Sequence, residues 1–299
     1  MTTAALYDPA APLTATGTLR RRRVVNRLAE AVATLAALAA VALLGIVVAG
    51  VIARGASVIN LGFLTKQPPL FGGPGGGIAP AIVGTAVIVA VATAIAMPIG
   101  VLVALHVTEF ARPRTARVIR LGLDLTNGLP SIVVGLFVFG LLVAGHEQSG
   151  VAASIALAII MLPLIARSSE EMLLLVPPPL REAADALGVR RWRTVLGVVL
   201  PHALGGIVTG TVLAVARAAG ETAPLVLLTS IFPNGVHWNP FGHALSTIPF
   251  SIFSLSEQAD PAGYERAWGS ALVLLSFILV ANVGARALLA RNNRSRTTR

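Results

Sequence analysis

The sequence of 299 residues contains no cysteine, and only 12% of its residues are charged. Without cysteine the chain can form no disulfide, no thiolate metal site and no redox-active thiol pair. Hydrophobic residues make up 55% of the chain, and the mean hydropathy of +0.81 is far too high for a water-soluble domain of this length. The composition therefore predicts an integral membrane protein.

Motifs for enzymatic chemistry are also missing. No segment matches the ATP-binding pattern G-x-x-x-x-G-K-[ST], since the glycine run at residues 72–77 lacks the lysine and the hydroxyl. We expect this run to be a flexible connector. The pattern G-x-S-x-G is absent, and the five histidines share no metal-ligand spacing with carboxylates. We expect no catalytic residue, metal or cofactor in this chain, so another chain must hydrolyse any ATP that is used.

Six apolar segments are long enough, or nearly so, to cross a hydrocarbon layer of about 30 Å as helices. They comprise residues 29–53, 79–105, 121–144, 151–166, 203–228 and 268–290. The first is longer than a signal-peptide core of about 7–15 residues, so we expect it to be retained. The fourth is short, and we expect Arg167 and Ser168 to end it. The predicted fold is all-α, with six transmembrane helices.

The positions of the basic residues predict the orientation. Most of the 23 arginine and lysine residues lie in four segments, residues 20–27, 112–120, 167–193 and 286–299. With six crossings all four segments fall on one side of the membrane, and short basic loops stay in the cytoplasm. We therefore expect a multi-pass protein of the cytoplasmic membrane with both termini in the cytoplasm. The net charge of +10 does not indicate nucleic acid, because the basic residues lie between apolar runs.

The chain divides accordingly into a membrane domain and two tails. Residues 1–27 are predicted to be a disordered, basic cytoplasmic tail, because Thr, Ala and Pro recur at the start without a period. Residues 28–291 are predicted to form the transmembrane domain. Residues 292–299 form a second basic tail, which we also expect in the cytoplasm.

An unusually long polar loop, at about residues 167–202, joins the fourth and fifth apolar segments. Three prolines at residues 177–179 end whatever precedes them, and residues 180–187 favour a short helix that Gly188 should stop. Another short amphipathic segment follows from Arg190. Two such helices are too polar to insert into the membrane, and they are suited to docking into a groove on a soluble partner.

This loop resembles the EAA loop of permease subunits in ATP-binding-cassette (ABC) importers. The positions that match are Glu182, Ala183, Ala184, Gly188, Leu200 and Pro201. Only Val198 differs, since the family has isoleucine there. The resemblance implies the type I ABC importer permease fold, in which this loop forms a cytoplasmic coupling helix that sits in a cleft of the ATPase subunit.

Arg217 and Glu221 lie deep in the fifth apolar segment. An arginine at the centre of a transmembrane helix costs about 2.5–3.5 kcal/mol on insertion scales, so its presence needs a reason. The i, i+4 spacing places both side chains on one helix face, where they form either a packing salt bridge or part of a polar path. Because the planar guanidinium fork binds tetrahedral oxyanions well, the pair favours a path for an anion.

Three stretches resemble phosphate permeases of the PstA type. They are residues 216–225, residues 127–137 and residues 167–172. The resemblance implies phosphate transport, in which the arginine and the glutamate of the first stretch take part. It extends the candidate substrate path to Arg217, Glu221, Asn127, Ser131, Thr222 and Arg167.

Alternatives stay open for three of these residues. Asn127 and Ser131, four residues apart, either donate hydrogen bonds toward the path or bond neighbouring helices. Arg167 either gates the path or only anchors its helix at the cytoplasmic boundary.

The resemblance also implies partners. These are a homologous second permease subunit, two cytoplasmic ATPase subunits and an extracytoplasmic phosphate-binding protein. The aromatic-rich outer segment of residues 229–265 either meets the binding protein or anchors the chain at the membrane interface. One alternative is an importer of another oxyanion, such as sulfate or molybdate. The other is a secondary transporter driven by an ion gradient, which would not need the coupling loop.

Overall fold

The computed structural model describes residues 18–69, 73–230, 235–258 and 260–297, and these residues form helices and connecting segments without any strand. The chain divides into two units, residues 1–50 and residues 51–299. The described part of the first unit is a single helix, α1 (Thr18–Gly55), which continues into the start of the second.

Helix α1 begins earlier than the sequence predicts. Residues 18–27, expected to belong to a disordered tail, are helical, because no proline or glycine interrupts the chain between Thr18 and Leu44 and arginine, leucine and alanine are strong helix formers. The rest of the predicted tail, residues 1–17, lies outside the described residues. At the other end of the chain the last helix continues to Thr297 and so includes most of the predicted second tail.

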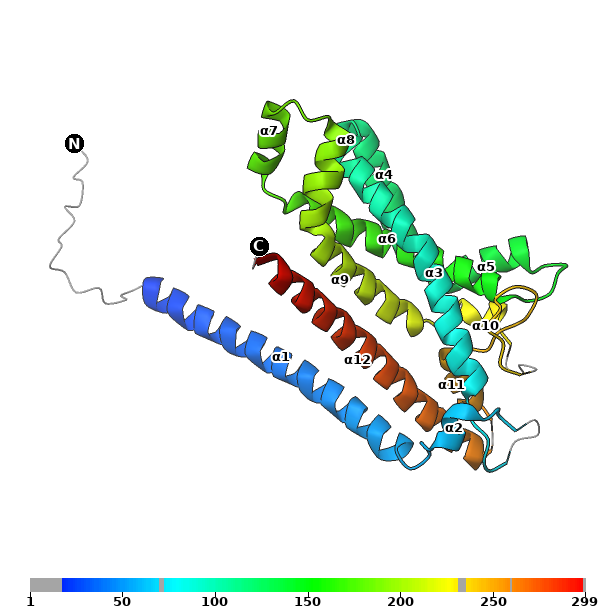
Figure 1. Cartoon of the computed structure of the whole chain (residues 1–299). Helices are drawn as coiled ribbons and strands as arrows, with labels where there is room; N and C mark the ends of the chain where they lie inside the picture. Colours follow the sequence, from blue (N-terminus) through cyan, green and yellow to red (C-terminus); the bar gives the residue numbers. More distant parts are fainter. Residues whose placement is uncertain (1–17, 70–72, 231–234, 259, 298–299) are drawn as a thin grey trace, which may run out of the picture. The chain divides into compact units, whose positions relative to one another are not determined.

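The second unit holds the remaining helices (Figure 1). They are α2 (Leu61–Thr65), α3 (Ala79–Leu105), α4 (Pro113–Gly128), α5 (Ser131–Leu142), α6 (Gly150–Leu174), α7 (Pro178–Ala186), α8 (Arg191–Thr194), α9 (Leu200–Ala219), α10 (Leu225–Leu228), α11 (Ile248–Ser256) and α12 (Pro261–Thr297). Two π-helical segments, His106–Phe110 and Val195–Val199, extend α3 and join α8 to α9.

The core of this unit lies around α6, which packs against α3 and α9. Leu157, Met161 and Ile165 of α6 are completely buried, and small residues on the facing helices let the backbones approach closely. A Cβ atom at Gly206 or Gly210 of α9 would overlap the side chains of Met172 or Ser168 of α6. Transmembrane helices associate through such close packing, since lipid tails supply no hydrophobic driving force between them.

Five of the helices are long and apolar enough to cross a membrane, and a bent pair of helices supplies a sixth candidate. Only the second predicted segment has the predicted bounds, as α3. The third is wrong as a single helix, because α4 and α5 meet at 96°. Pro130 causes this break, since it has no N–H group and restricts Leu129 to an extended conformation, with φ −69° and ψ 136°.

The fourth and fifth predicted segments also have different bounds. Helix α6 does not end at Arg167 and Ser168 but continues to Leu174, because these polar side chains find partners: Ser168 donates to the carbonyl of Ile165, and Arg167 forms ion pairs. The fifth crossing helix runs through Arg191–Ala219 and ends before the apolar run does, at Gly220. The predicted all-α membrane fold is confirmed, with these corrections to its helices.

Candidate functional site

The predicted Arg217–Glu221 pair lies at the end of a helix. Arg217 is in the last turn of α9, and Glu221 follows Gly220, whose N–H donates to the carbonyl of Arg217. The prediction that the pair lies deep inside a transmembrane helix is therefore wrong. Glycine weakens the helix, and Pro224 disfavours helical geometry in the residue before it.

The ion pair itself is loose. The Nε atom of Arg217 is 3.7 Å from Oε1 of Glu221, which is too long for a hydrogen bond. The arginine side chain is 57% exposed and that of Glu221 is 18% exposed. Within the described residues, no hydrogen bond holds the guanidinium of Arg217. Its donors are therefore available to a ligand, although a cation in the last turn of a helix is also favoured by the helix dipole.

The turn after Arg217 lies beside α5. The carbonyl of Thr222 accepts hydrogen bonds from Leu225 and Val226, at 3.0 and 3.1 Å, and thereby starts α10. A Cβ atom placed on Gly135 of α5 would be 2.6 Å from Cα of Pro224. Ser131, the first residue of α5, lies one turn before Gly135. The structure thus places α5, one turn after Ser131, against Pro224, which follows Thr222 by two residues.

Asn127 and Ser131 flank the break between α4 and α5. Asn127 is exposed in the last turn of α4, whereas Ser131 is half-buried. In the described part of the chain neither side chain forms a hydrogen bond, so neither is used to fix a neighbouring helix of this chain. Their predicted role as donors toward the substrate stays a prediction.

Arg167 belongs to a different cluster, an ion-pair network between α4 and α6. Its Nη2 atom is 2.5 Å from each carboxylate oxygen of Asp124, and its Nη1 atom is 3.3 Å from Glu170. Arg120 donates from Nε to Glu170 at 2.6 Å. The two positive and two negative charges balance, and Glu170 is buried. This arrangement favours an anchoring role for Arg167. The partners of Arg167, which are Asp124, Glu170 and Arg120, were not predicted from the sequence.

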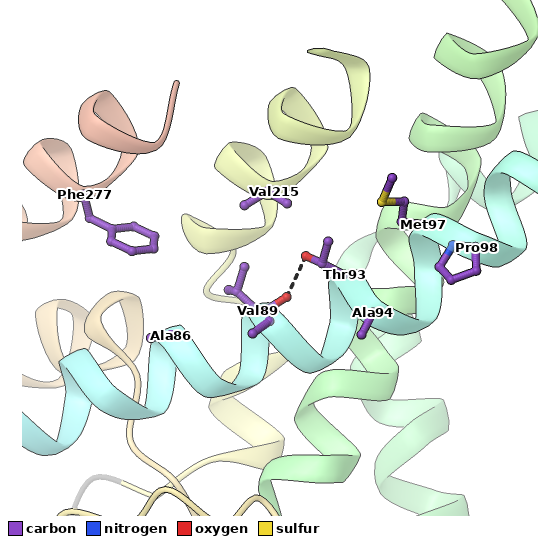
Figure 2. Close-up of a pocket in the computed structure, with 9 residues that line it drawn as sticks. Ala86, Val89, Thr93, Ala94, Met97, Pro98, Val215 and Phe277 are labelled. Atoms are coloured by element: carbon purple, nitrogen blue, oxygen red, sulfur yellow. Dashed lines mark hydrogen bonds between the residues drawn. The ribbon is translucent and has the colours of Figure 1, made fainter. Parts of the chain in front are cut away.

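An apolar groove of about 560 Å³ lies between α3, α9 and α12 (Figure 2). It is lined by Ala86, Val89, Ala90, Thr93, Ala94, Met97, Pro98, Val215 and Phe277. The hydroxyl of Thr93 donates to the carbonyl of Val89 at 2.7 Å, so it is already used. With no charged residue in its lining, this groove is unsuited to an inorganic anion.

The predicted coupling helix is present as α7, which stands at the same end of the second unit as α8 (Figure 1). It starts at Pro178, where the missing N–H of proline has no helical partner to lose, and the chain leaves it through Gly188 at φ +68°. Glu182 and Ala183 are exposed, whereas Ala184 is buried. The outer face of α7 is therefore open to a partner.

The end of the predicted motif, Leu200 and Pro201, forms the start of α9. Because Pro201 cannot donate a hydrogen bond, the helix widens just before it, and the N–H of Leu200 donates to the carbonyl of Val195 in the π pattern. These residues shape the connection from α8 into α9. They do not extend the exposed surface of α7.

Gly73 and Gly75 of the glycine run, which was expected to be a flexible connector, are held in place. The buried Arg266 donates from Nη1 to the carbonyls of Gly73 and Gly75, at 2.7 and 2.9 Å. Asp260 accepts from the N–H of Gly73 at 3.1 Å. This hydrogen bond, with those from Ala262 and Gly263, lowers the pKa of Asp260 below its ordinary value, although desolvation opposes the shift. The sequence alone gives no signal for this contact, because Arg266 is 193 residues from Gly73 and 191 residues from Gly75.

Comparison with known families gives a match to one family model. The model described as "Binding-protein-dependent transport system inner membrane component" matches residues 96–295. The matched range contains α7 and the residues of the candidate path.

Relatives that match most of the chain include two phosphate transport permeases. The phosphate transport system permease protein PstA 1 of Mycobacterium tuberculosis (strain ATCC 25618 / H37Rv) is 36% identical over 293 residues, which cover 95% of this chain and 94% of the relative. The phosphate transport system permease protein PstA of Yersinia pestis is 37% identical over 243 residues, which cover 80% and 81%.

Among solved structures, the fold resembles a chain of a bacterial alginate ABC transporter in complex with an alginate-bound periplasmic protein. The TM-score is 0.67 at 16% identity, and the match covers 92% of this chain and 98% of the other. At this identity the likeness shows the fold alone.

Proposed function

The chain belongs to the family of binding-protein-dependent transport system inner membrane components, and from this premise we propose that it is the permease subunit of an ATP-driven phosphate importer. The observation that carries the proposal is the similarity to phosphate transport permeases over nearly the whole chain. The family predicted from the sequence is confirmed, as is a multi-pass protein of the inner membrane.

The geometry of α7 supports transport that is driven by ATP. A permease needs a surface that receives movement from an ATPase, and α7 offers the exposed Glu182 and Ala183 on a short helix that Gly188 terminates. ATP hydrolysis is then the task of separate subunits. The assembly would contain a homologous second permease, two ATPase subunits and an extracytoplasmic phosphate-binding protein.

The chemistry of the candidate path supports an anion as the substrate. Arg217 keeps its donors available, and Glu221 lies near enough to hold the side chain without a hydrogen bond. We infer that the guanidinium binds phosphate oxygens transiently, helped by Thr222, Asn127 and Ser131. A loose pair suits transport, because a site on a path must release its ion as well as bind it.

We place both termini and α7 in the cytoplasm, because the basic segments gather at these points. In this arrangement the Arg266-bound glycine run and the segment before α12 face outward, toward the binding protein. The membrane domain then extends through residues 28–291, with α7 in its cytoplasmic loop.

Labelled-phosphate uptake tests this proposal in a strain that lacks its own importer and expresses the chain with its partner subunits. We expect uptake that stops when ATP is depleted, survives an ionophore that dissipates ion gradients, and is not reduced by excess sulfate or molybdate. Competition by sulfate or molybdate would indicate another oxyanion. Loss of uptake with the ionophore while ATP is present would indicate a secondary transporter.

A further inference from the structure

The guanidinium of Arg181 in α7 forms several hydrogen bonds to other parts of the chain. Its Nε and Nη2 atoms donate to Oε1 of Glu109, at 3.2 and 3.0 Å. Its Nη1 donates to the carbonyl of Val176 at 2.6 Å, and Nη2 also donates to that of Leu173 at 2.9 Å. One guanidinium therefore fastens α7 to the end of α6 and to Glu109.

Glu109 connects three parts of the chain. It lies in the π-helical segment that extends α3, and its side chain is only 5% exposed. One carboxylate oxygen takes the bonds from Arg181, while the other is 3.6 Å from Nη2 of Arg191, at the start of α8. A buried carboxylate needs such partners, because an unpaired charge away from water is strongly disfavoured. Arg181 therefore fixes one oxygen of Glu109, whereas Arg191 makes only a long contact with the other.

Helix α7 consequently has two different faces. Glu182 and Ala183 are exposed and open to the ATPase, whereas Arg181 and Ala184 face the other helices of the chain. The backbone joins α7 only to α6 and α8, and neither connection leads to α3. The Arg181–Glu109 contact reaches α3, which packs closely on α6 in the core.

We propose that Glu109 and Arg181 are positioning residues that transmit the movement of α7 into α3. This inference rests on the proposed function, in which an ATPase moves α7. The fork of Arg181 spans a carboxylate and two backbone carbonyls at once, so it resists rotation of α7 against the ends of α3 and α6. Lysine cannot replace this geometry, because its single ammonium group has no fork.

The test uses the full complex, with both permeases, the ATPases and the binding protein, reconstituted in proteoliposomes. Phosphate transport and ATP hydrolysis are measured on the same vesicles for wild type, Glu109→Gln, Arg181→Lys and Glu109→Asp. Glu171→Gln is the matched control, since Glu171 is an exposed carboxylate near the end of α6. We expect the first two variants to assemble and hydrolyse ATP but to transport about ten-fold less phosphate per ATP. Glu109→Asp should restore most of the ratio, and Glu171→Gln should match wild type.

Two results would overturn the inference. One is an unchanged ratio of transport to hydrolysis in Glu109→Gln, and the other is loss of assembly in all three variants at these two positions, which would indicate only a folding role. If the wild-type complex hydrolyses ATP but moves no phosphate, the proposed function fails instead. In that case the role of Glu109 is tested by the stimulation of ATP hydrolysis that the binding protein causes. Loss of this stimulation in Glu109→Gln but not in Glu171→Gln supports the inference. Stimulation that persists in Glu109→Gln contradicts it.

Discussion

Arginine side chains in this protein differ in how fully their donors are used. Arg266 is buried and binds two carbonyls of the glycine run, and Arg167 is held by two carboxylates. Arg217 is mostly exposed and has only a long contact to Glu221. Because the guanidinium groups of Arg167 and Arg266 already bind protein oxygens, these two residues stabilise the protein. Arg217 is the one of the three that is able to bind an anion.

The stabilisation from the hydrogen bond between Asp260 and Gly73 should depend on pH. The N–H of Gly73 lowers the pKa of Asp260 in the folded protein. The hydrogen bond to the ionised carboxylate therefore stabilises the fold above the ordinary pKa of aspartate, and this stabilisation is lost as the pH falls through the lowered pKa of the folded state. We expect the melting temperature of wild type to exceed that of Asp260→Asn by a constant margin from pH 7 to pH 5. The margin should shrink only below about pH 4.

Thermal unfolding of both proteins in detergent, measured across this pH range, checks the prediction. Glu265→Gln, an exposed carboxylate in the first turns of α12, is the control and should keep a constant difference from wild type. A margin that already shrinks between pH 7 and 5 would show that the pKa of Asp260 is raised, which contradicts the hydrogen bond to Gly73.

At the scale of helices, the sequence predicts what depends on neighbouring residues. The bounds of α3 and the presence of a short helix before Gly188 follow from local composition, and both are confirmed, although this short helix starts two residues earlier than predicted, at Pro178. The continuation of α6 past Arg167 could not be predicted, because the stabilising partner Asp124 comes from another helix. The break at Pro130 carried a local signal, since proline disfavours helix before it, but the length of the apolar run concealed it.

In the candidate site, too, local features could be predicted from the sequence and contacts between distant residues could not. The Arg217–Glu221 pair and the coupling motif were found because their members lie within a few residues of one another or at a known spacing. The Glu109–Arg181 contact joins residues 72 positions apart, and a single sequence gives no signal for such a pair. The end of α9 before Glu221 was missed because the apolar run continues beyond it.

The packing of α5 against the turn after α9 should be sensitive to one methyl group. A Cβ atom on Gly135 would collide with the backbone of Pro224, which cannot move aside as a flexible side chain can. We expect Gly135→Ala to destabilise the protein by about 1–3 kcal/mol and to reduce phosphate uptake. Gly140→Ala in the same helix meets no atom within 4 Å, so it should be neutral or slightly stabilising.

Thermal unfolding and uptake of the two variants, compared with wild type, provide the measurement. Equal melting temperatures for Gly135→Ala and Gly140→Ala would show that α5 does not pack on this turn. In that case Gly135, one turn after Ser131, would not lie against Pro224.

At the scale of the whole molecule, the bent pair α4–α5 decides the number of crossings. If the pair crosses the membrane, Arg114 and Glu147 lie on opposite sides, and Asp185 of α7 lies on the side of Arg114. The basic segments predict that this side is the cytoplasm. All three side chains are exposed, and the chain has no native cysteine.

Single cysteines at these three positions, treated with a membrane-impermeant thiol reagent, test this topology. We expect labelling of Glu147→Cys in intact cells, and labelling of Arg114→Cys and Asp185→Cys only after permeabilisation. Labelling of Arg114→Cys from the outside together with Glu147→Cys would mean that α4 and α5 enter and leave on one side. The chain would then have five crossings, and its termini would lie on opposite sides.

The central claim is that phosphate passes Arg217 while ATP drives the movement through α7. Replacing Arg217 by glutamine removes the donor fork and leaves α7 unchanged. Phosphate uptake and ATP hydrolysis are measured in the same membranes. We predict that Arg217→Gln still assembles and hydrolyses ATP at a basal rate, while its phosphate uptake falls by about ten-fold or more, as expected when bonds to a charged ligand are lost. Uptake by Arg217→Gln at the wild-type rate would contradict the claim and reduce the Arg217–Glu221 pair to a contact that only supports packing.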